Sequence, residues 1–447
     1  MQRFIDKITD FGDKTVIVAN NKSHTYADLS HQISVYKQQL DKQINNGQVV
    51  VLLGDYTFHS AALLFALSLK QCIVVPVTSS VTEEIQQRVD EAYTDWILTL
   101  DGESYQLKQQ TSSDKHHIIQ DLQHKQHAGL ILFSSGSTGK PKAMIHDLDN
   151  LLQAYLHRTP TELTILVLLM FDHIGGIDTL ISSLAKGMKI VIPSIRDADV
   201  VAQLIEQHKV NVLPSSPTFL NLMLIADSLV KYDLSSLEVI TYGAEVMPQY
   251  LLTRLKETLP SITFIQKFGT SETGVIKTSS RSSTSLDMRL NDPNQEYKTI
   301  DGELYLRSKT QVLGYLNASM ENFTQDGWFK TGDLIEETDD GYLRIIGRSK
   351  EVINVGGEKV LPVEVESTIL ELDAIDDCMV YAEQNAIVGQ VVTADIVLKS
   401  QANISNIKKQ IRNHCKAKLD SYKVPVKIYF KDKTNFGQRF KKMRLQH

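Results

Sequence analysis

The sequence predicts an α/β fold in which a large N-terminal domain of parallel sheets flanked by helices is followed by a small α+β domain. Short apolar segments alternate with helical segments through the first three quarters of the chain, and this pattern changes near Gly341. Strand–helix–strand units imply parallel sheets, because parallel strands need a crossover connection. The chain has 447 residues, which is too long for one compact core and suits two or three domains.

The alternation begins with the apolar run VVVLL, which ends at Gly54. Apolar runs of this length between turn residues are typical of buried strands, and the longer segments between them have helical periodicity. We expect strands over residues 49–53, 72–77, 189–192 and 210–213, and helices over residues 60–70 and 200–208.

Two later strands end at glycines. A strand is expected over residues 237–242, directly before Gly243, and another over residues 262–268, directly before Gly269. The helix between them has leucines at a spacing of four, Leu251, Leu255 and Leu259. Ligands of parallel sheets bind at the carboxyl ends of the strands. We therefore expect the functional site near these two glycines.

Polar segments interrupt this pattern over residues 109–127 and 277–285. The first contains four histidines, at positions 116, 117, 124 and 127, but no acidic residue or cysteine is regularly spaced with them. A solvated loop is favoured over a metal site. Further on, a strand over residues 342–346 leads into Gly347 and Arg348, and the last hundred or so residues form the small α+β unit.

Composition excludes several classes of function. The net charge is -6, whereas nucleic-acid binders have a basic excess. The three cysteines, Cys72, Cys378 and Cys415, lie far apart without a CxxC pair, as in a reduced cytosolic protein. No secretory signal and no apolar run of the ~20 residues needed to span a bilayer is present. We expect a cytoplasmic protein without a membrane span.

The strongest local signal is LILFSSGSTGKPK, at residues 130–142. An apolar strand runs into nine residues that hold four hydroxyls, two glycines and two lysines. Closely spaced glycines let backbone N–H groups surround an anion, to which hydroxyls donate and lysines add positive charge. The spacing differs from the Walker type, which disfavours a kinase of that class. The predicted phosphate-binding residues are Ser134, Ser135, Gly136, Ser137, Thr138, Gly139, Lys140 and Lys142.

This loop closely resembles the phosphate loop of the AMP-forming adenylating enzymes, which include acyl- and aryl-CoA ligases, peptide-synthetase adenylation domains and luciferases. Other motifs of that family follow in order. Phe268-Gly269-Thr270-Ser271-Glu272 is similar to the family's aromatic-Gly-x-Thr-Glu motif, which implies that Phe268 stacks on adenine, Ser271 binds a phosphate and Glu272 binds Mg²⁺. Gly243, Ala244 and Glu245 resemble the adenine-side loop.

The resemblance continues to the end of the chain. It implies that Asp333 and Arg348 bind the ribose, that Ile345 lies near adenine and that Lys350 is the hinge. The implied domains are residues 1–347, which include a small β-barrel-like part, a hinge at 348–350 and a mobile α+β domain at 351–447.

The implied reaction has two steps. A carboxylic acid attacks ATP to give an acyl-adenylate, and pyrophosphate leaves with stabilisation by Mg²⁺, the loop and Lys142. A thiol then takes the acyl group. The leading hypothesis is an acid–CoA ligase. The alternative is a stand-alone adenylating enzyme that loads an amino acid or acyl acid onto the phosphopantetheine of an acyl carrier protein.

The chain departs from the family near its end, where the family has Gly-Lys-(Ile/Val)-x-Arg with a catalytic Lys. With Gly437 as the anchor, Gln438 replaces that Lys; with Phe440 in the Ile position, Arg439 replaces it and Lys442 takes the Arg position. The second alignment is favoured because it keeps a cation, although Arg and Lys are not interchangeable. An inactive nucleotide-binding homologue is the third hypothesis.

Two adjacent residues are candidates for the acid pocket. His173 falls at a position that is His in many CoA ligases, and Asp172 falls where amino-acid-activating members place the Asp that pairs with the substrate amine. A helix N-cap is the structural alternative for Asp172. The candidate substrates therefore range from a simple acyl or aryl acid to an amino acid.

Overall fold

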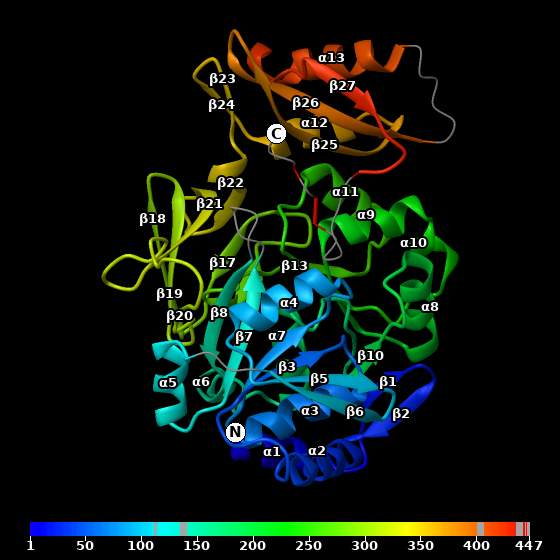
Figure 1. The fold of residues 1–447 in the computed structure, drawn as a ribbon. Coiled ribbons are helices and arrows are strands. Elements are labelled where there is room, and N and C mark those ends of the chain that lie inside the picture. The colour runs from blue at the N-terminus through cyan, green and yellow to red at the C-terminus, as the bar shows by residue number, and fades with distance from the viewer. Residues whose placement is uncertain (111–113, 135–140, 400–405, 435–440, 443, 445–447) are drawn as a thin grey trace.

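The computed structural model describes residues 1–110, 114–134, 141–399, 406–434, 441–442 and 444. In this part of the chain, two seven-stranded sheets and a six-stranded antiparallel sheet precede a five-stranded sheet near the C-terminus. The predicted fold class is confirmed: parallel sheets with helices come first, and a smaller α+β unit lies at one end of the molecule (Figure 1).

The first seven-stranded sheet has the order β20-β8-β7-β4-β3-β5-β6 and a parallel centre. The helix α3 (Phe58–Leu69) covers it and is largely apolar, as expected of a helix that is buried over most of its surface. Thr57 and Ser60 form a capping box that begins this helix. The strands are β3 (Val49–Leu53), β4 (Ile73–Val77), β5 (Trp96–Asp101), β6 (Ser104–Gln109), β7 (Gly129–Ser134), β8 (Lys142–Asp147) and β20 (Gly314–Tyr315).

The second seven-stranded sheet has the order β13-β12-β11-β9-β10-β1-β2 and is parallel except at β2. One apolar core, built around α3 and α7 (Ile174–Ala185), contains residues from both sheets. The strands are β1 (Thr15–Ala19), β2 (Lys22–Thr25), β9 (Thr164–Leu166), β10 (Lys189–Ile192), β11 (Val212–Ser215), β12 (Val239–Tyr242) and β13 (Thr263–Gln266). The other helices of this part are α1 (Gln2–Thr9), α2 (Tyr26–Leu40), α4 (Thr82–Glu91), α5 (His117–His124), α6 (Leu148–Gln153), α8 (Ala198–His208), α9 (Pro217–Ile225), α10 (Ser228–Lys231) and α11 (Gln249–Thr258).

The six-stranded sheet is the small third part expected beside the parallel sheets. All of its pairings are antiparallel. Its strands are β16 (Thr278–Ser280), β17 (Met288–Leu290), β18 (Gln295–Ile300), β19 (Glu303–Ser308), β21 (Phe329–Glu337) and β22 (Leu343–Arg348). A separate pair, β14 (Phe268–Thr270) and β15 (Gly274–Ile276), connects this region to β13.

The C-terminal unit begins after the 3₁₀ turn η1 (Ser349–Glu351) and has its own apolar core. The last strand of the six-stranded sheet ends at Arg348 and the next sheet begins at Ile353. The elements are β23 (Ile353–Val355), β24 (Glu358–Val360), α12 (Pro362–Leu370), β25 (Ile375–Asn385), β26 (Gly389–Leu398), α13 (Ile407–Lys418), η3 (Ser421–Lys423) and β27 (Lys427–Phe430). No described helix is both long and apolar enough to cross a bilayer.

Two local predictions are wrong. The strand expected over residues 262–268 is interrupted at Lys267, because β14 turns away from the sheet to pair with β15. The segment expected as a solvated loop contains α5, which begins after the capping residue His116. This helix forms because Ile119 and Leu122, one turn apart, are buried against the domain.

Candidate active site

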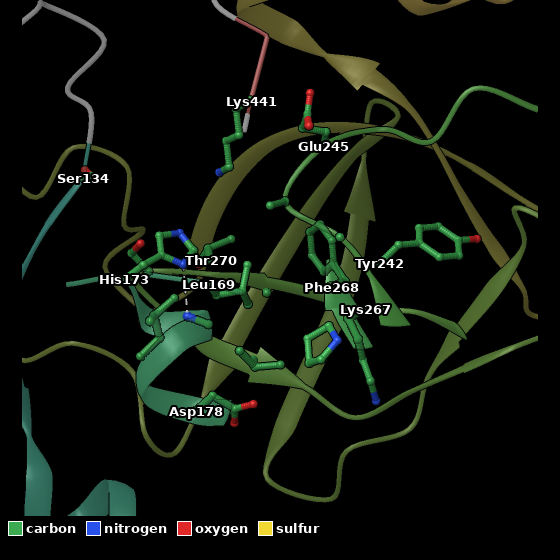
Figure 2. A pocket seen from close by; sticks show the side chains of 18 of the residues that line it. Ser134, Leu169, His173, Asp178, Tyr242, Glu245, Lys267, Phe268, Thr270 and Lys441 are labelled. Atoms are coloured by element: carbon green, nitrogen blue, oxygen red, sulfur yellow. Dashed lines mark hydrogen bonds between the residues drawn. The ribbon is translucent and has the colours of Figure 1, made fainter. Parts of the chain in front are cut away.

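One large cavity, of about 1740 Å³, lies between the strand ends of the N-terminal domain and the C-terminal unit. Every predicted site residue that the structure describes lines it. These residues are Ser134, Lys142, Asp172, His173, Gly243, Ala244, Glu245, Phe268, Gly269, Thr270, Ser271, Glu272, Asp333, Ile345, Arg348 and Lys350. Figure 2 shows several of them around the cavity, with His173 and Phe268 on its walls. Motifs spread over nearly half of the chain thus meet at one place.

The two ends of the predicted phosphate loop are held by a strand pair. Ser134, the last residue of β7, lies opposite Lys142, the first residue of β8. The Lys142 Nζ lies 5.0 Å from the centre of the Tyr315 ring, a favourable cation–π contact. The intervening Ser135, Gly136, Ser137, Thr138, Gly139 and Lys140 lie outside the described residues, so their role stays a prediction.

Glu272 follows β14 and has a partner that the sequence did not indicate. The Tyr315 hydroxyl donates a hydrogen bond of 2.9 Å to Glu272 Oε1. Burial raises the pKa of the Glu272 carboxyl, and Tyr315, Lys142 and Arg348 oppose the shift. No described group of three His, Cys, Asp or Glu side chains is placed to hold a metal ion. Mg²⁺ often binds through one carboxylate and substrate phosphates, and Glu272 fits that mode.

Gly243, directly after β12, and Gly269, within β14, allow backbone segments to approach closely. A Cβ on Gly243 would lie 2.6 Å from the Lys267 carbonyl oxygen, and one on Gly269 would lie 2.6 Å from the Gly274 carbonyl oxygen. These spaces admit only glycine. Beside them Phe268 and Ile345 pack in one apolar cluster and line the cavity. This arrangement offers a flat apolar surface beside exposed backbone groups.

Asp333 and Arg348 lie opposite each other on neighbouring strands. The Arg348 Nε donates to Asp333 Oδ1 at 2.9 Å, and Asp333 is only 3% exposed. Burial raises the pKa of Asp333, and Arg348 opposes the shift. Its second oxygen, Oδ2, has no hydrogen-bond donor among the described residues. A buried acceptor at a cavity wall suits a hydroxyl-bearing ligand such as ribose.

The two acid-pocket candidates lie at the start of α7. His173, not Asp172, is the N-cap: its Nδ1 accepts a hydrogen bond of 3.1 Å from the Gly175 backbone N–H. The structural alternative for Asp172 is therefore wrong. Asp172 is buried and forms an ion pair of 3.2 Å with Arg88. Because Arg88 already balances this carboxylate, the geometry disfavours Asp172 as an amine-binding group.

Three residues of the C-terminal segment line the cavity: Lys441, Lys442 and Arg444. Gln438 and Arg439 lie outside the described residues, so neither alignment is tested. Lys442 is anchored: its Nζ pairs with Asp377 at 3.0 Å and its backbone N–H donates to Glu245 Oε2 at 3.1 Å. Arg444 pairs with Glu366 at 3.0 Å and Glu351 at 2.8 Å. These contacts fix the backbone on both sides of position 443.

Lys441 is the residue that sequence reasoning missed. It lines the cavity, and Figure 2 shows its side chain directed into the cavity from the C-terminal segment. Burial raises the pKa of Glu245, and Lys442 and Lys441 oppose the shift. Lys441 also opposes the raised pKa of Asp333. A signal was available, because Lys441 and Arg444 have the three-residue separation of the Lys and Arg in the family motif.

The comparisons with known proteins agree with this arrangement. The model of the AMP-binding enzyme family matches residues 4–316, and that of the AMP-binding enzyme C-terminal domain matches residues 364–437. A 2-succinylbenzoate–CoA ligase of Staphylococcus epidermidis is 25% identical over 94% of this chain and 91% of its own length. An indoleacetate–CoA ligase of Aromatoleum aromaticum is 27% identical, over 68% of this chain but only 63% of its own length.

Solved structures share the fold. An anthranilate CoA ligase in complex with anthranoyl-AMP has a TM-score of 0.83 at 21% identity, over 98% of this chain and 95% of that one. The o-succinylbenzoate CoA synthetase of Bacillus subtilis, in complex with its acyl-adenylate, has a TM-score of 0.79 at 21% identity, over 99% of this chain and 97% of that one. The chain therefore belongs to the AMP-binding enzyme family, the AMP-forming adenylating enzymes that its motifs resemble.

Proposed function

We propose that this chain uses ATP to activate a carboxylic acid as an acyl-adenylate and then transfers the acyl group to CoA. The observation that carries the proposal is one cavity. It brings the ends of the phosphate loop, Glu272 and the Asp333–Arg348 pair together with a lysine from the C-terminal segment. A nucleotide, its phosphates and an acid could meet there.

The nucleotide is held by side chains that the geometry already prepares. Phe268 and Ile345 provide the adenine surface, and Asp333 Oδ2 accepts from a ribose hydroxyl. Burial raises the pKa of that carboxyl, and Arg348 opposes the shift through its hydrogen bond to Oδ1. Ser134 and Ser271 line the cavity, where their hydroxyls would donate to phosphate oxygens.

The acid lies between His173 and the α-phosphate, with its reacting carboxylate facing Lys441. A cation at this place offsets the repulsion between the two anions and stabilises the charge of the transition state. Lys142 and Glu272 line the same cavity and would stabilise the leaving pyrophosphate. Mg²⁺, when bound through Glu272 and phosphate oxygens, supplies further positive charge to the leaving group.

CoA is the acceptor that the comparisons favour, since the relatives named above are ligases of 2-succinylbenzoate, indoleacetate and anthranilate with CoA. The Arg88–Asp172 pair argues against an amino acid, and with it against the carrier-protein alternative in its amino-acid form. The presence of Lys441 in the cavity argues against an inactive homologue. Residues 348–350, with Lys350 as the hinge, would let the C-terminal domain turn between the two steps.

The proposed reaction is tested by identifying its products. With ATP, Mg²⁺, CoA and a panel of carboxylic acids, we expect acid-dependent formation of AMP, pyrophosphate and an acyl-CoA, identified by mass spectrometry. A parallel reaction offers a pantetheinylated carrier protein in place of CoA. Transfer only to the carrier would replace CoA as the acceptor, and acid-dependent ADP would contradict the proposed reaction.

A further inference from the structure

Four charged side chains gather at the far end of the cavity, and neither the family motifs nor the proposed reaction uses them. They are Arg158, Asp178, Lys186 and Lys267, and all of them line the cavity. In Figure 2, Asp178 and the amino group of Lys267 lie at the end of the pocket away from Lys441 and Glu245. This group thus contains three cations and one carboxylate.

The cations are not neutralised by the protein. Within the described part of the chain, the Nζ atoms of Lys186 and Lys267 form no hydrogen bond or ion pair. The Arg158 Nε is buried without a partner there. Asp178 has no described cation at ion-pair distance, and its carboxylate instead accepts a hydrogen bond from the Tyr155 hydroxyl.

These groups nevertheless act on one another electrostatically. Burial lowers the pKa of Lys267; Asp178 opposes that shift, while Lys186 and Arg158 add to it. Burial likewise lowers the pKa of Lys186, with Arg158 adding to the shift. Burial raises the pKa of Asp178. Partly desolvated cations that repel each other are costly unless an anion joins them. The cluster is therefore short of negative charge.

The position of the cluster in the cavity indicates which anion it could bind. Asp178 and Lys186 follow the N-cap His173 along α7 by five and thirteen residues, which is roughly 7 Å and 20 Å along a helix axis. Lys267 directly precedes Phe268, and in Figure 2 its amino group lies beyond the Phe268 ring, on the side away from Glu245 and Lys441. The cluster thus lies at the end of the cavity away from Lys441, beyond the place proposed for the reacting carboxylate.

We propose that Lys267, Lys186 and Arg158 bind a second carboxylate at the far end of the acid, so that the substrate is a dicarboxylic acid. Asp178, whose carboxylate accepts a hydrogen bond from Tyr155, offsets part of the positive charge of Lys267 and Lys186 electrostatically. This inference rests on the proposed function, since it concerns the acid that the same cavity activates.

The test is acid-dependent exchange of labelled pyrophosphate into ATP without CoA, so that binding of CoA phosphates has no influence. Linear and aromatic dicarboxylic acids are compared with monocarboxylic acids of the same length and with acids that end in an amide or an ammonium group. We expect kcat/KM to be roughly 10- to 100-fold higher for the dicarboxylic member of a matched pair. The difference should lie mainly in KM.

Lys267→Gln and Lys186→Gln should each reduce the ratio between the dicarboxylic and the matched monocarboxylic acid toward one, and the double variant should remove it. Lys108→Gln, at an exposed position on β6 outside the cavity, is the matched control and should keep the wild-type ratio. Melting temperatures check that the variants are folded, and the wild-type preference tests the inference without any substitution.

The experiment distinguishes failure of the proposed function from failure of the second-carboxylate site. Absence of exchange with every acid would overturn the proposed function and this inference with it. Exchange in which monocarboxylic or ammonium-ended acids are preferred would overturn the second-carboxylate site alone. A dicarboxylate preference that survives the double variant would show that other residues recognise the far end of the acid, which also contradicts the assignment.

Discussion

Replacing Glu272 by Gln should reduce the rate of acyl-adenylate formation by roughly 100-fold or more while the fold survives. The substitution keeps the shape of the side chain and its contact with Tyr315 but removes the charge that would hold a metal ion. Metal stabilisation of a leaving group is worth several kcal/mol, and about 3 kcal/mol corresponds to roughly 100-fold. Single-turnover adenylation over a range of Mg²⁺ concentrations, with melting temperatures as the check on folding, measures the effect.

Tyr315→Phe is the matched control, because it removes the hydrogen bond to Glu272 and leaves the carboxylate in place. Its effect should be far smaller, on the order of the 10-fold that a single hydrogen bond is worth. If Glu272→Gln retained a near-normal rate at saturating Mg²⁺, the carboxylate would have a structural role instead.

Lys441→Ala should slow adenylation by roughly 100- to 1000-fold, the usual cost of losing one group that stabilises transition-state charge. Transfer from a supplied acyl-adenylate to CoA should be much less affected, since the C-terminal segment would leave the site for that step. The reason is geometric: buried ion pairs of Lys442 and Arg444 hold the segment so that Lys441 enters the cavity. Both half-reactions are measured separately.

A control variant and the two other candidates for the catalytic residue lie within ten residues of Lys441. Lys433→Ala changes an exposed lysine that does not line the cavity, and it should alter neither step. If Arg439 supplies the cation, Arg439→Ala should abolish adenylation and Lys441→Ala should have little effect. If Gln438 occupies the catalytic position, Gln438→Lys should raise the adenylation rate. These three patterns do not overlap.

Local sequence patterns were sufficient for most of the fold. The strands at residues 49–53 and 189–192 have the predicted bounds, as β3 and β10, because an apolar run between turn residues is a local signal. Gly243 directly follows β12, as predicted, whereas Gly269 lies within β14. The gathering of Asp333, Arg348 and Glu272 in one cavity followed from the order of the motifs, and no periodicity in the sequence contains that information.

The features that were missed depend on contacts between distant segments. Lys441 reaches the cavity because Asp377, on a strand of the C-terminal sheet, holds its neighbour Lys442. Tyr315 reaches Glu272 because β20 pairs with β8. Helix α5 was hidden within a polar segment, since only two of its apolar side chains are buried against the domain. Each of these depends on tertiary packing that local propensity does not encode.

The central claim is that this chain joins a carboxylic acid to the AMP part of ATP. Acid-dependent exchange of labelled pyrophosphate into ATP, measured without any thiol acceptor, tests it most directly because only reversible adenylation returns pyrophosphate to ATP. We predict exchange that requires both Mg²⁺ and an acid from the panel, and that falls strongly in Glu272→Gln and Lys441→Ala. Folded wild-type protein that binds ATP but shows no exchange with any acid would contradict the account.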